Sequence, residues 1–251
     1  MPVWIIAGGW GMLAASGLVL GALIGWFVPL SRRTVAAVMA FGSGVLIATV
    51  ANEVMEGSAA RGGLLAASSG MLIGALLFTA ANALLKRQGA AHRKRSGDQQ
   101  QAAGGDDHSG MAIALAATMD GIPESLLLGL SLLEDGHIGV ALLLAFFISN
   151  LPEGLSSAAG MRRAKRSAAY TFGVWGSLVV ISGVAAVLGY VIGHHLSPEL
   201  LAVGSAIAGG AILAMLADIM IPEVYDGTHD LAGIVTVIGF LSAFLVSKTI
   251  G

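Results

Sequence analysis

The chain has 251 residues, of which 56% are hydrophobic and 11% are charged, and its formal net charge at pH 7 is −2. Soluble globular domains usually contain about 25% charged residues, so this composition favours a membrane protein. The slightly acidic balance argues against a nucleic-acid partner. Because the chain contains no cysteine, disulfides and thiolate metal sites are excluded.

Apolar segments long enough to cross a bilayer, which takes about 20 residues, recur along the whole chain. Eight of them qualify: residues 3–29, 34–56, 62–85, 110–133, 137–161, 168–193, 199–224 and 231–249. No basic region precedes the first segment, and its apolar run is too long for a signal peptide, so we expect it to be retained. We therefore predict an all-α polytopic membrane protein with eight transmembrane helices in a single transmembrane domain, residues 1–251.

One connection between these segments, residues 86–110, is long and polar. Its sequence, KRQGAAHRKRSGDQQQAAGGDDHSG, is rich in Gly, Gln, Ala and charged residues. Such a composition cannot bury enough apolar surface to fold, so we predict a disordered loop.

Basic residues are concentrated on alternate connections. Eleven of the 13 Lys and Arg residues follow the first, third or fifth segment. The positive-inside rule then places these three connections, the polar loop among them, in the cytoplasm. With eight spans, both termini are expected outside. The compact connections favour a bacterial protein of the inner (plasma) membrane.

Carboxylates interrupt three of the predicted spans. A charged side chain at the centre of a spanning helix costs roughly 2.5–3.5 kcal/mol on insertion scales. The fourth, fifth and seventh spans nevertheless contain Asp120, Glu124, Glu153, Asp218 and Glu223. Intramembrane acids usually serve transport or proton transfer, so these residues predict a functional site.

A proline precedes a glutamate in each of these three spans, in GIPES (121–125), NLPEG (150–154) and MIPEV (220–224). A proline inside a helix removes one backbone donor and disturbs the carbonyl four residues earlier. Within a membrane, such a carbonyl is tolerated where a neighbour, water or ligand satisfies it. A carboxylate beside exposed carbonyl oxygens indicates a site for a cation that prefers oxygen ligands.

Helical spacing places these polar groups on shared faces. Asp120 and Glu124 are four residues apart, and Asn150 and Glu153 are three residues apart, so each pair shares one face. The short connection between the fourth and fifth spans predicts antiparallel neighbours with facing motifs. Clustered carboxylates are relieved by a divalent cation or by protons. The pattern thus favours metal permeation or a proton relay, which can coexist.

Other polar residues are candidates for a pathway or a gate. Asn52 and Glu53 lie near the end of the second span, where they could line an entrance or be interfacial. Ser149, Asp218 and Glu223 are further pathway or gating candidates, although Glu223 could also lie at the membrane edge. A single intramembrane glutamate could be a protonated hydrogen-bond donor, but three repeated Pro-Glu elements favour function. Because the chain has no His-Glu-x-x-His, no cysteine and no triad-like arrangement, we expect no enzyme.

These motifs resemble those of the ZIP (Zrt/Irt-like) family of divalent metal transporters. Residues 41–49, FGSGVLIAT, resemble the Phe-x-x-Gly-Val start of that family's second helix, and the Pro-Glu motifs match its fourth, fifth and seventh helices. The resemblance implies external termini and an inverted repeat of helices one to three and six to eight around helices four and five. It also implies a primary metal position at Asp120, Glu124, Asn150 and Glu153.

The chain also departs from the family pattern. The family's helix-four histidine and the following asparagine are here Asp120 and Gly121, and residues 176–190 of the sixth span contain no acid. We therefore expect the family's second metal position to be absent or weak. An all-oxygen ligand set no longer favours zinc, so Mn²⁺, Fe²⁺ or Mg²⁺ become as plausible.

The motifs together predict transport of a divalent cation, with the metal as transported substrate and no prosthetic group. The alternative is a proton-coupled carrier of a non-metal substrate that uses the same acids as a proton relay. The expected partners are the metal ion, the lipid bilayer and a second copy of the chain in a homodimer.

Overall fold

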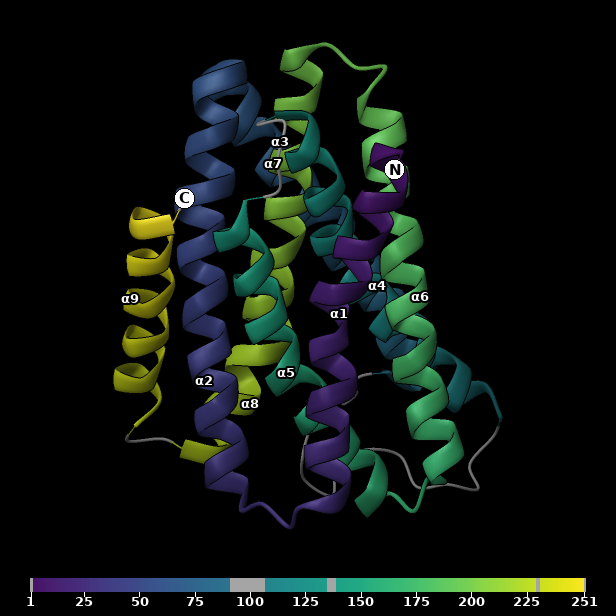
Figure 1. Cartoon of the computed structure of the whole chain (residues 1–251). Coiled ribbons are helices and arrows are strands. Elements are labelled where there is room, and N and C mark those ends of the chain that lie inside the picture. The colour runs from purple at the N-terminus through teal and green to yellow at the C-terminus, as the bar shows by residue number, and fades with distance from the viewer. Residues whose placement is uncertain (1, 91–106, 135–138, 229–230, 251) are drawn as a thin grey trace.

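Figure 1 shows the computed structural model of the chain, which describes residues 2–90, 107–134, 139–228 and 231–250. In these ranges every regular element is a helix, which confirms the predicted all-α class. The α-helices are α1 (Val3–Phe27), α2 (Arg32–Thr49), α3 (Glu56–Leu85), α4 (Asp107–Glu134), α5 (Val140–Arg163), α6 (Ala168–Gly193), α7 (Pro198–Met215), α8 (Ile221–Thr228) and α9 (Ala232–Ile250). Three π-helical segments accompany them: η1 (Val50–Met55), η2 (Lys86–Ala90) and η3 (Leu216–Met220).

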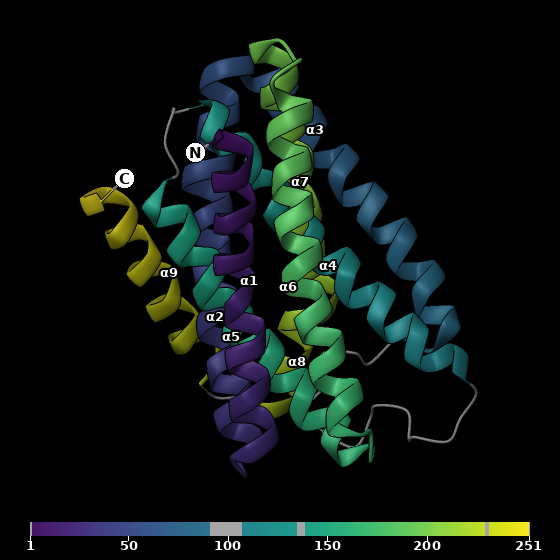
Figure 2. The ribbon, with the colours of Figure 1, turned by 45° about the vertical axis from the view of Figure 1, so that its right-hand side comes forward.

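Six helical stretches among the described residues are long and apolar enough to cross a membrane, as in a multi-pass membrane protein. They are Val3–Phe27, Arg32–Leu85, Val140–Arg163, Ala168–Gly193, Pro198–Gly227 and Ala232–Thr249. Arg32–Leu85 contains both the second and the third predicted span. Within it, Gly63 has a φ of 81°, which glycine adopts readily, and the chain reverses direction there (Figures 1 and 2). The helix α4, whose apolar run contains Asp120 and Glu124, is not among the six. The count of eight spans and the inverted repeat therefore stay predictions.

Both ends of the segment predicted as a polar loop, residues 86–110, are helical in the structure. Residues 86–90 form η2, and α4 already begins at Asp107. The remaining residues, 91–106, lie outside the described part of the chain.

The helices associate in three groups. In the first, α1 packs against α5 and α6, and α6 also packs against α4. In the second, α3 packs against α7, and in the third, α2 packs against α9 and α8. The first group meets the third mainly where α5 contacts α2, and it meets the second mainly where α4 contacts α7. The predicted metal-binding helices, α4 and α5, therefore both lie where groups meet.

Glycines on α1 bring its backbone against α5. A Cβ built on Gly17, Gly21 or Gly25 would overlap the backbone carbonyl of Phe147, Leu151 or Leu155, respectively. This four-residue spacing of small residues is the pattern that lets membrane helices pack closely. On the other side of α5, Pro152 packs against Gly42 of α2, where a Cβ would lie 2.6 Å from Pro152 Cγ. The position of α5 is thus set by close contacts on two sides.

Helix ends that flank the three connections rich in basic residues lie in one half of the bundle. Figures 1 and 2 show the α1–α2 turn, the C-terminal end of α3 and the α5–α6 turn in the lower half. The first turn of α1 and the last turn of α9 lie in the upper half. At the lower end, the Arg162 guanidinium donates a hydrogen bond to the carbonyl of Trp26 and links α5 to α1. The alternation of charge in the sequence therefore corresponds to a separation in space.

Candidate functional site

Both acids of the GIPES region are buried on α4. The exposed fractions of Asp120 and Glu124 are 2% and 3%. The helix continues through Pro123, whose missing N–H removes the usual donor to the carbonyl of Met119. The Ser125 hydroxyl donates to the Gly121 carbonyl at 2.9 Å. Backbone oxygens whose helical pattern is altered therefore lie in the same turn as two carboxylates.

The matching turn of α5 is equally buried. The exposed fractions of Ser149, Asn150 and Glu153 are 0%, 5% and 4%. Asn150 Nδ2 donates to the Ala14 carbonyl of α1 at 3.1 Å, and the Ser149 hydroxyl donates to the Phe146 carbonyl at 3.0 Å. Because the amide nitrogen of Asn150 is used in this bond, its side-chain oxygen is the atom that could ligate a cation.

The Pro-Glu turns of α4 and α5 lie less directly opposite each other than the short connection between the fourth and fifth spans predicted. The helix α4 packs chiefly against α6 and α7, whereas α5 packs chiefly against α1 and α2, and α4 and α5 touch only over a small area. Across the described ranges, no three His, Cys, Asp or Glu side chains converge closely enough to hold one metal ion. Asp120 and Glu124 thus lie on one buried helix, and Asn150 and Glu153 on another.

The structure places Glu223 beside α5, in a buried position. Its side chain is 3% exposed, and Glu223 Oε1 accepts a hydrogen bond from the Ser156 hydroxyl at 3.4 Å. Ser156 follows Glu153 by three residues and shares its helix face. The acid of the third Pro-Glu motif is therefore close to the face of α5 that carries the second.

Asp218 is bonded across helices to a residue that the sequence did not single out. Asn82 of α3, which is 1% exposed, donates from Nδ2 to Asp218 Oδ2 at 3.2 Å. A buried amide in a membrane helix needs a polar partner, and Asn82 interrupts an otherwise apolar run in the third predicted span. That interruption is the signal by which the sequence could have identified Asn82.

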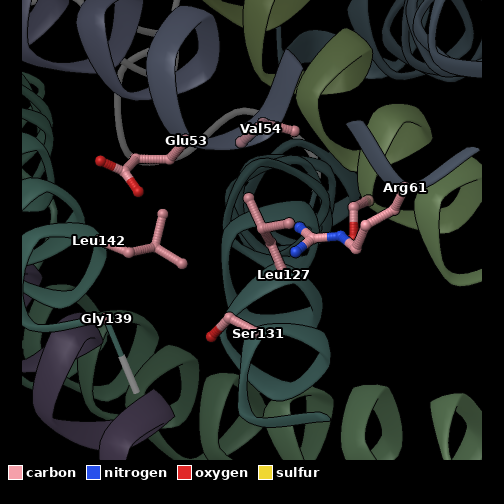
Figure 3. Close-up of a pocket in the computed structure, with 8 residues that line it drawn as sticks. Glu53, Val54, Arg61, Leu127, Ser131, Gly139 and Leu142 are labelled. Atoms are coloured by element: carbon pink, nitrogen blue, oxygen red, sulfur yellow. The ribbon is translucent and has the colours of Figure 1, made fainter. Parts of the chain in front are cut away.

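Glu53 lines a small polar cavity of about 40 Å³, which Figure 3 shows. Arg61, Ser131 and Ser205 also line it, and Arg61 extends toward Leu127 while Glu53 lies on the side of Leu142. A water molecule needs about 10–15 Å³ of such volume, so the cavity has room for water. Ser131 follows Glu124 by seven residues and therefore lies two turns along the same face of α4. Sequence reasoning did not select Arg61.

Outside the cavity, the side chains of Glu53 and Asn52 form different hydrogen bonds. Glu53 Oε1 accepts a hydrogen bond from the Ser247 hydroxyl of α9. Asn52 Nδ2 donates to the carbonyl of Ala48 at 2.8 Å, within its own helical run. Of the two predicted entrance residues, Glu53 is therefore the one that lines the cavity.

Two pathway candidates lie in π-helical segments. Glu53 is in η1, and Asp218 is in η3. Short π-helical turns inside α-helices are frequent at functional sites, because the wider turn changes the direction of the side chains. The hydrophobic pattern of the sequence carries no mark of these turns.

No protein-family model and no curated protein matches the chain. The resemblance to the ZIP family therefore rests on the motifs within the predicted second, fourth, fifth and seventh spans. It enters the proposal below as a hypothesis.

Proposed function

We propose that the chain carries a divalent metal cation across a membrane, with Asp120, Glu124, Asn150 and Glu153 as its central ligands. The observation that supports this proposal is their burial, since all four side chains are at most 5% exposed. Burying carboxylates in an apolar surrounding is costly unless a cation or proton compensates them. Both helices that carry them also contain a proline directly before a glutamate.

The ligand set contains oxygen donors alone. Carboxylate and amide oxygens suit Mn²⁺, Fe²⁺ and Mg²⁺ as well as they suit Zn²⁺, because no imidazole or thiolate adds a preference for softer ions. We propose that the cation is the transported substrate. It would shield the carboxylates from one another while it passes.

The remaining polar residues extend from the central acids toward both ends of the bundle. Glu53, in the cavity two turns beyond Glu124, would serve the entrance on the side of the chain termini, with Asn52 beside it. Ser149, next to Asn150, would line the central part of the route. Glu223 and Asp218 would serve the route toward the basic end as exit or gating acids.

The distribution of basic residues supports a cytoplasmic position for the α1–α2 and α5–α6 turns. We propose a bacterial inner membrane protein with both termini outside the cytoplasm. A homodimer is part of this proposal.

The test is metal uptake by liposomes that contain the purified chain, with Glu124→Gln and Glu153→Gln combined in one variant. Glutamine keeps the size of the side chain but removes its charge, so we expect the variant to fold and its uptake to fall to the level of empty liposomes. Uptake of Zn²⁺, Mn²⁺ and Fe²⁺ is followed with a chelating fluorophore inside the vesicles.

Glu56→Gln is the matched control, because Glu56 is an exposed acid at the start of α3. We expect this control to transport as the unmodified chain does. Undiminished uptake by the folded Glu124→Gln, Glu153→Gln variant would show that these acids do not carry the metal.

One observation favours the second candidate, a proton-coupled carrier of a non-metal substrate. The bond from Ser156 to Glu223 places a third acid close to the Glu153 face of α5, and a row of acids bridged by hydroxyls can pass protons without holding a metal. This carrier would show pH-driven flux in metal-free buffer, and Glu223→Gln would abolish that flux. Metal uptake that persists without a pH gradient would instead favour the first candidate.

A further inference from the structure

An apolar groove of about 390 Å³ opens between α3, α4 and α7. Its walls include Leu77 and Phe78 of α3, Leu115 and Ile122 of α4, and Ile207 of α7. Leu77 and Leu115 are 61% and 51% exposed, so the groove opens to the outside of the bundle. Because the groove opens on the outer side of a bundle that spans a membrane, it faces lipid rather than water.

The one hydroxyl side chain among the described residues that line the groove, Thr118, forms a hydrogen bond within its own helix. The Thr118 hydroxyl, which lines the groove, donates to the Ala114 carbonyl at 2.9 Å. The nearest unassigned segment of the chain, residues 91–106, is polar and charged, so its burial in an apolar groove would be unfavourable. The chemistry of the walls therefore matches a hydrocarbon chain.

Two exposed basic residues lie beyond one end of the groove. Ala81 lines the groove, and Lys86 and Arg87 follow it on the same helical run, where both are exposed. Five residues of helix correspond to about 7.5 Å, which separates Ala81 from Lys86. Basic residues at the cytoplasmic end of membrane helices attract anionic headgroups. We propose that this groove binds an acyl chain of an anionic phospholipid whose headgroup phosphate contacts Lys86 and Arg87.

The bound lipid would pack against the turn of α4 that carries the central acids. Met119, Ile122 and Pro123 line the groove, while Asp120 and Glu124 in the same turn are buried in the bundle. A chain that fills the groove therefore restricts the movement of this turn. Binding of the lipid stands on the groove itself, whereas any effect on transport rests on the proposed function.

The test is native mass spectrometry of the purified full chain, equilibrated in detergent with equal amounts of phosphatidylglycerol and phosphatidylcholine. We expect the unmodified chain to retain phosphatidylglycerol about tenfold more than phosphatidylcholine, as two basic contacts allow. Lys86→Gln combined with Arg87→Gln should remove this preference. The matched control is Arg32→Gln combined with Arg33→Gln, an exposed basic pair at the same end of the bundle, which should keep it.

A second pair of variants tests the groove. Ala81→Leu fills it from α3 and should reduce retention of both lipids, whereas Ala80→Leu, on the exposed side of α3, should not. Thr118→Leu fills the groove from α4 and replaces Ala81→Leu if that variant aggregates. Because the readout is bound lipid, failure of the transport proposal would leave this result unchanged.

Two outcomes would overturn the proposal. One is equal retention of both lipids by the unmodified chain and by the Lys86→Gln, Arg87→Gln variant. The other is a dimer mass that Ala81→Leu converts to a monomer, since the groove would then be an interface between two copies of the chain.

Discussion

The acids of this bundle occur in two kinds of altered helix. Glu124 and Glu153 follow prolines in α4 and α5, which remain α-helical, whereas Glu53 and Asp218 lie in the π-helical segments η1 and η3. Both devices disturb the regular backbone hydrogen bonds next to a carboxylate. The two regions nevertheless surround their acids differently.

The π-helical acids are partly exposed and each accepts a hydrogen bond from another helix, Glu53 from Ser247 and Asp218 from Asn82. The acids after proline are almost fully buried, on helices that are positioned by close backbone contacts. From this difference we expect the π-helical acids to help to join helices, whereas the acids in the proline turns of α4 and α5 would bind the ligand of the proposed function. The variants below separate the two roles.

The largest effect is expected from Gly21→Leu, which disrupts the close contact between α1 and α5. A Cβ at residue 21 would overlap the Leu151 carbonyl, and backbone cannot yield as a flexible side chain does. We expect the free energy of unfolding to fall by more than about 3 kcal/mol, beyond the usual range for overpacking. Size-exclusion chromatography and thermal unfolding would measure the loss of folded protein.

Gly9→Leu is the matched control on the same helix, because nothing lies within 4 Å of a Cβ built there. It should fold as the unmodified chain does. If Gly21→Leu were as stable as this control, α1 would not position α5.

A smaller and more specific effect is expected from Pro123→Ala. Alanine restores the N–H that can bond to the Met119 carbonyl, so that carbonyl becomes less available to a cation. We expect stability to be kept and the rate of metal uptake to fall by about 10–100-fold, the range for lost supporting groups at metal sites. Liposome uptake and a thermal melt of the same preparation would measure both quantities.

Pro198→Ala is the control for this substitution. Pro198 lies in the first turn of α7, where the missing donor has no helical partner in any case. Pro198→Ala should change neither the stability nor the rate of metal uptake. A Pro123→Ala variant with full uptake would remove the proline turn from the proposed transport site.

The helical class and the apolar stretches could be predicted from the sequence, because hydropathy depends on the length and composition of single segments. A break between residues 56 and 62 was also predicted, and the chain reverses close by at Gly63, whereas the positive φ of that glycine was not predicted. The π-helical turns are also unmarked, because η1 and η3 share the composition of the helices around them.

Which helices would be neighbours was predicted less well than where the acids occur. The short connection between the fourth and fifth spans predicted antiparallel neighbours with facing motifs, but close-packing glycines decide the arrangement. A Cβ on Gly129 of α4 or Gly189 of α6 would overlap the backbone of the other helix, just as Gly21 fits α1 to α5. Such pairing depends on the shapes of two surfaces, which a single sequence does not reveal.

The last variant, Asn82→Ala, addresses the π-helical region. It removes the donor to Asp218 Oδ2, and because that acceptor is partly exposed we expect the loss to cost about 0.5–1.5 kcal/mol, the net contribution of a typical hydrogen bond. We expect unfolding at a lower temperature with uptake retained, which is the reverse of the result for Pro123→Ala. Ser69→Ala, which removes an exposed hydroxyl bonded within its own helix, should change stability by less than about 0.5 kcal/mol.

A double-mutant cycle with Asp218→Ala isolates the contact between the two side chains. If the contact joins the helices, the double variant should lose less free energy of unfolding than the sum of the losses in the two single variants. Additive losses would mean that Asn82 and Asp218 act separately. An Asn82→Ala variant that keeps its stability but loses uptake would instead mean that the bond from Asn82 orients Asp218 within the transport route. The two kinds of altered helix would then share one role, and the hydrogen bond from α3 would serve to orient a ligand rather than to hold η3 in place.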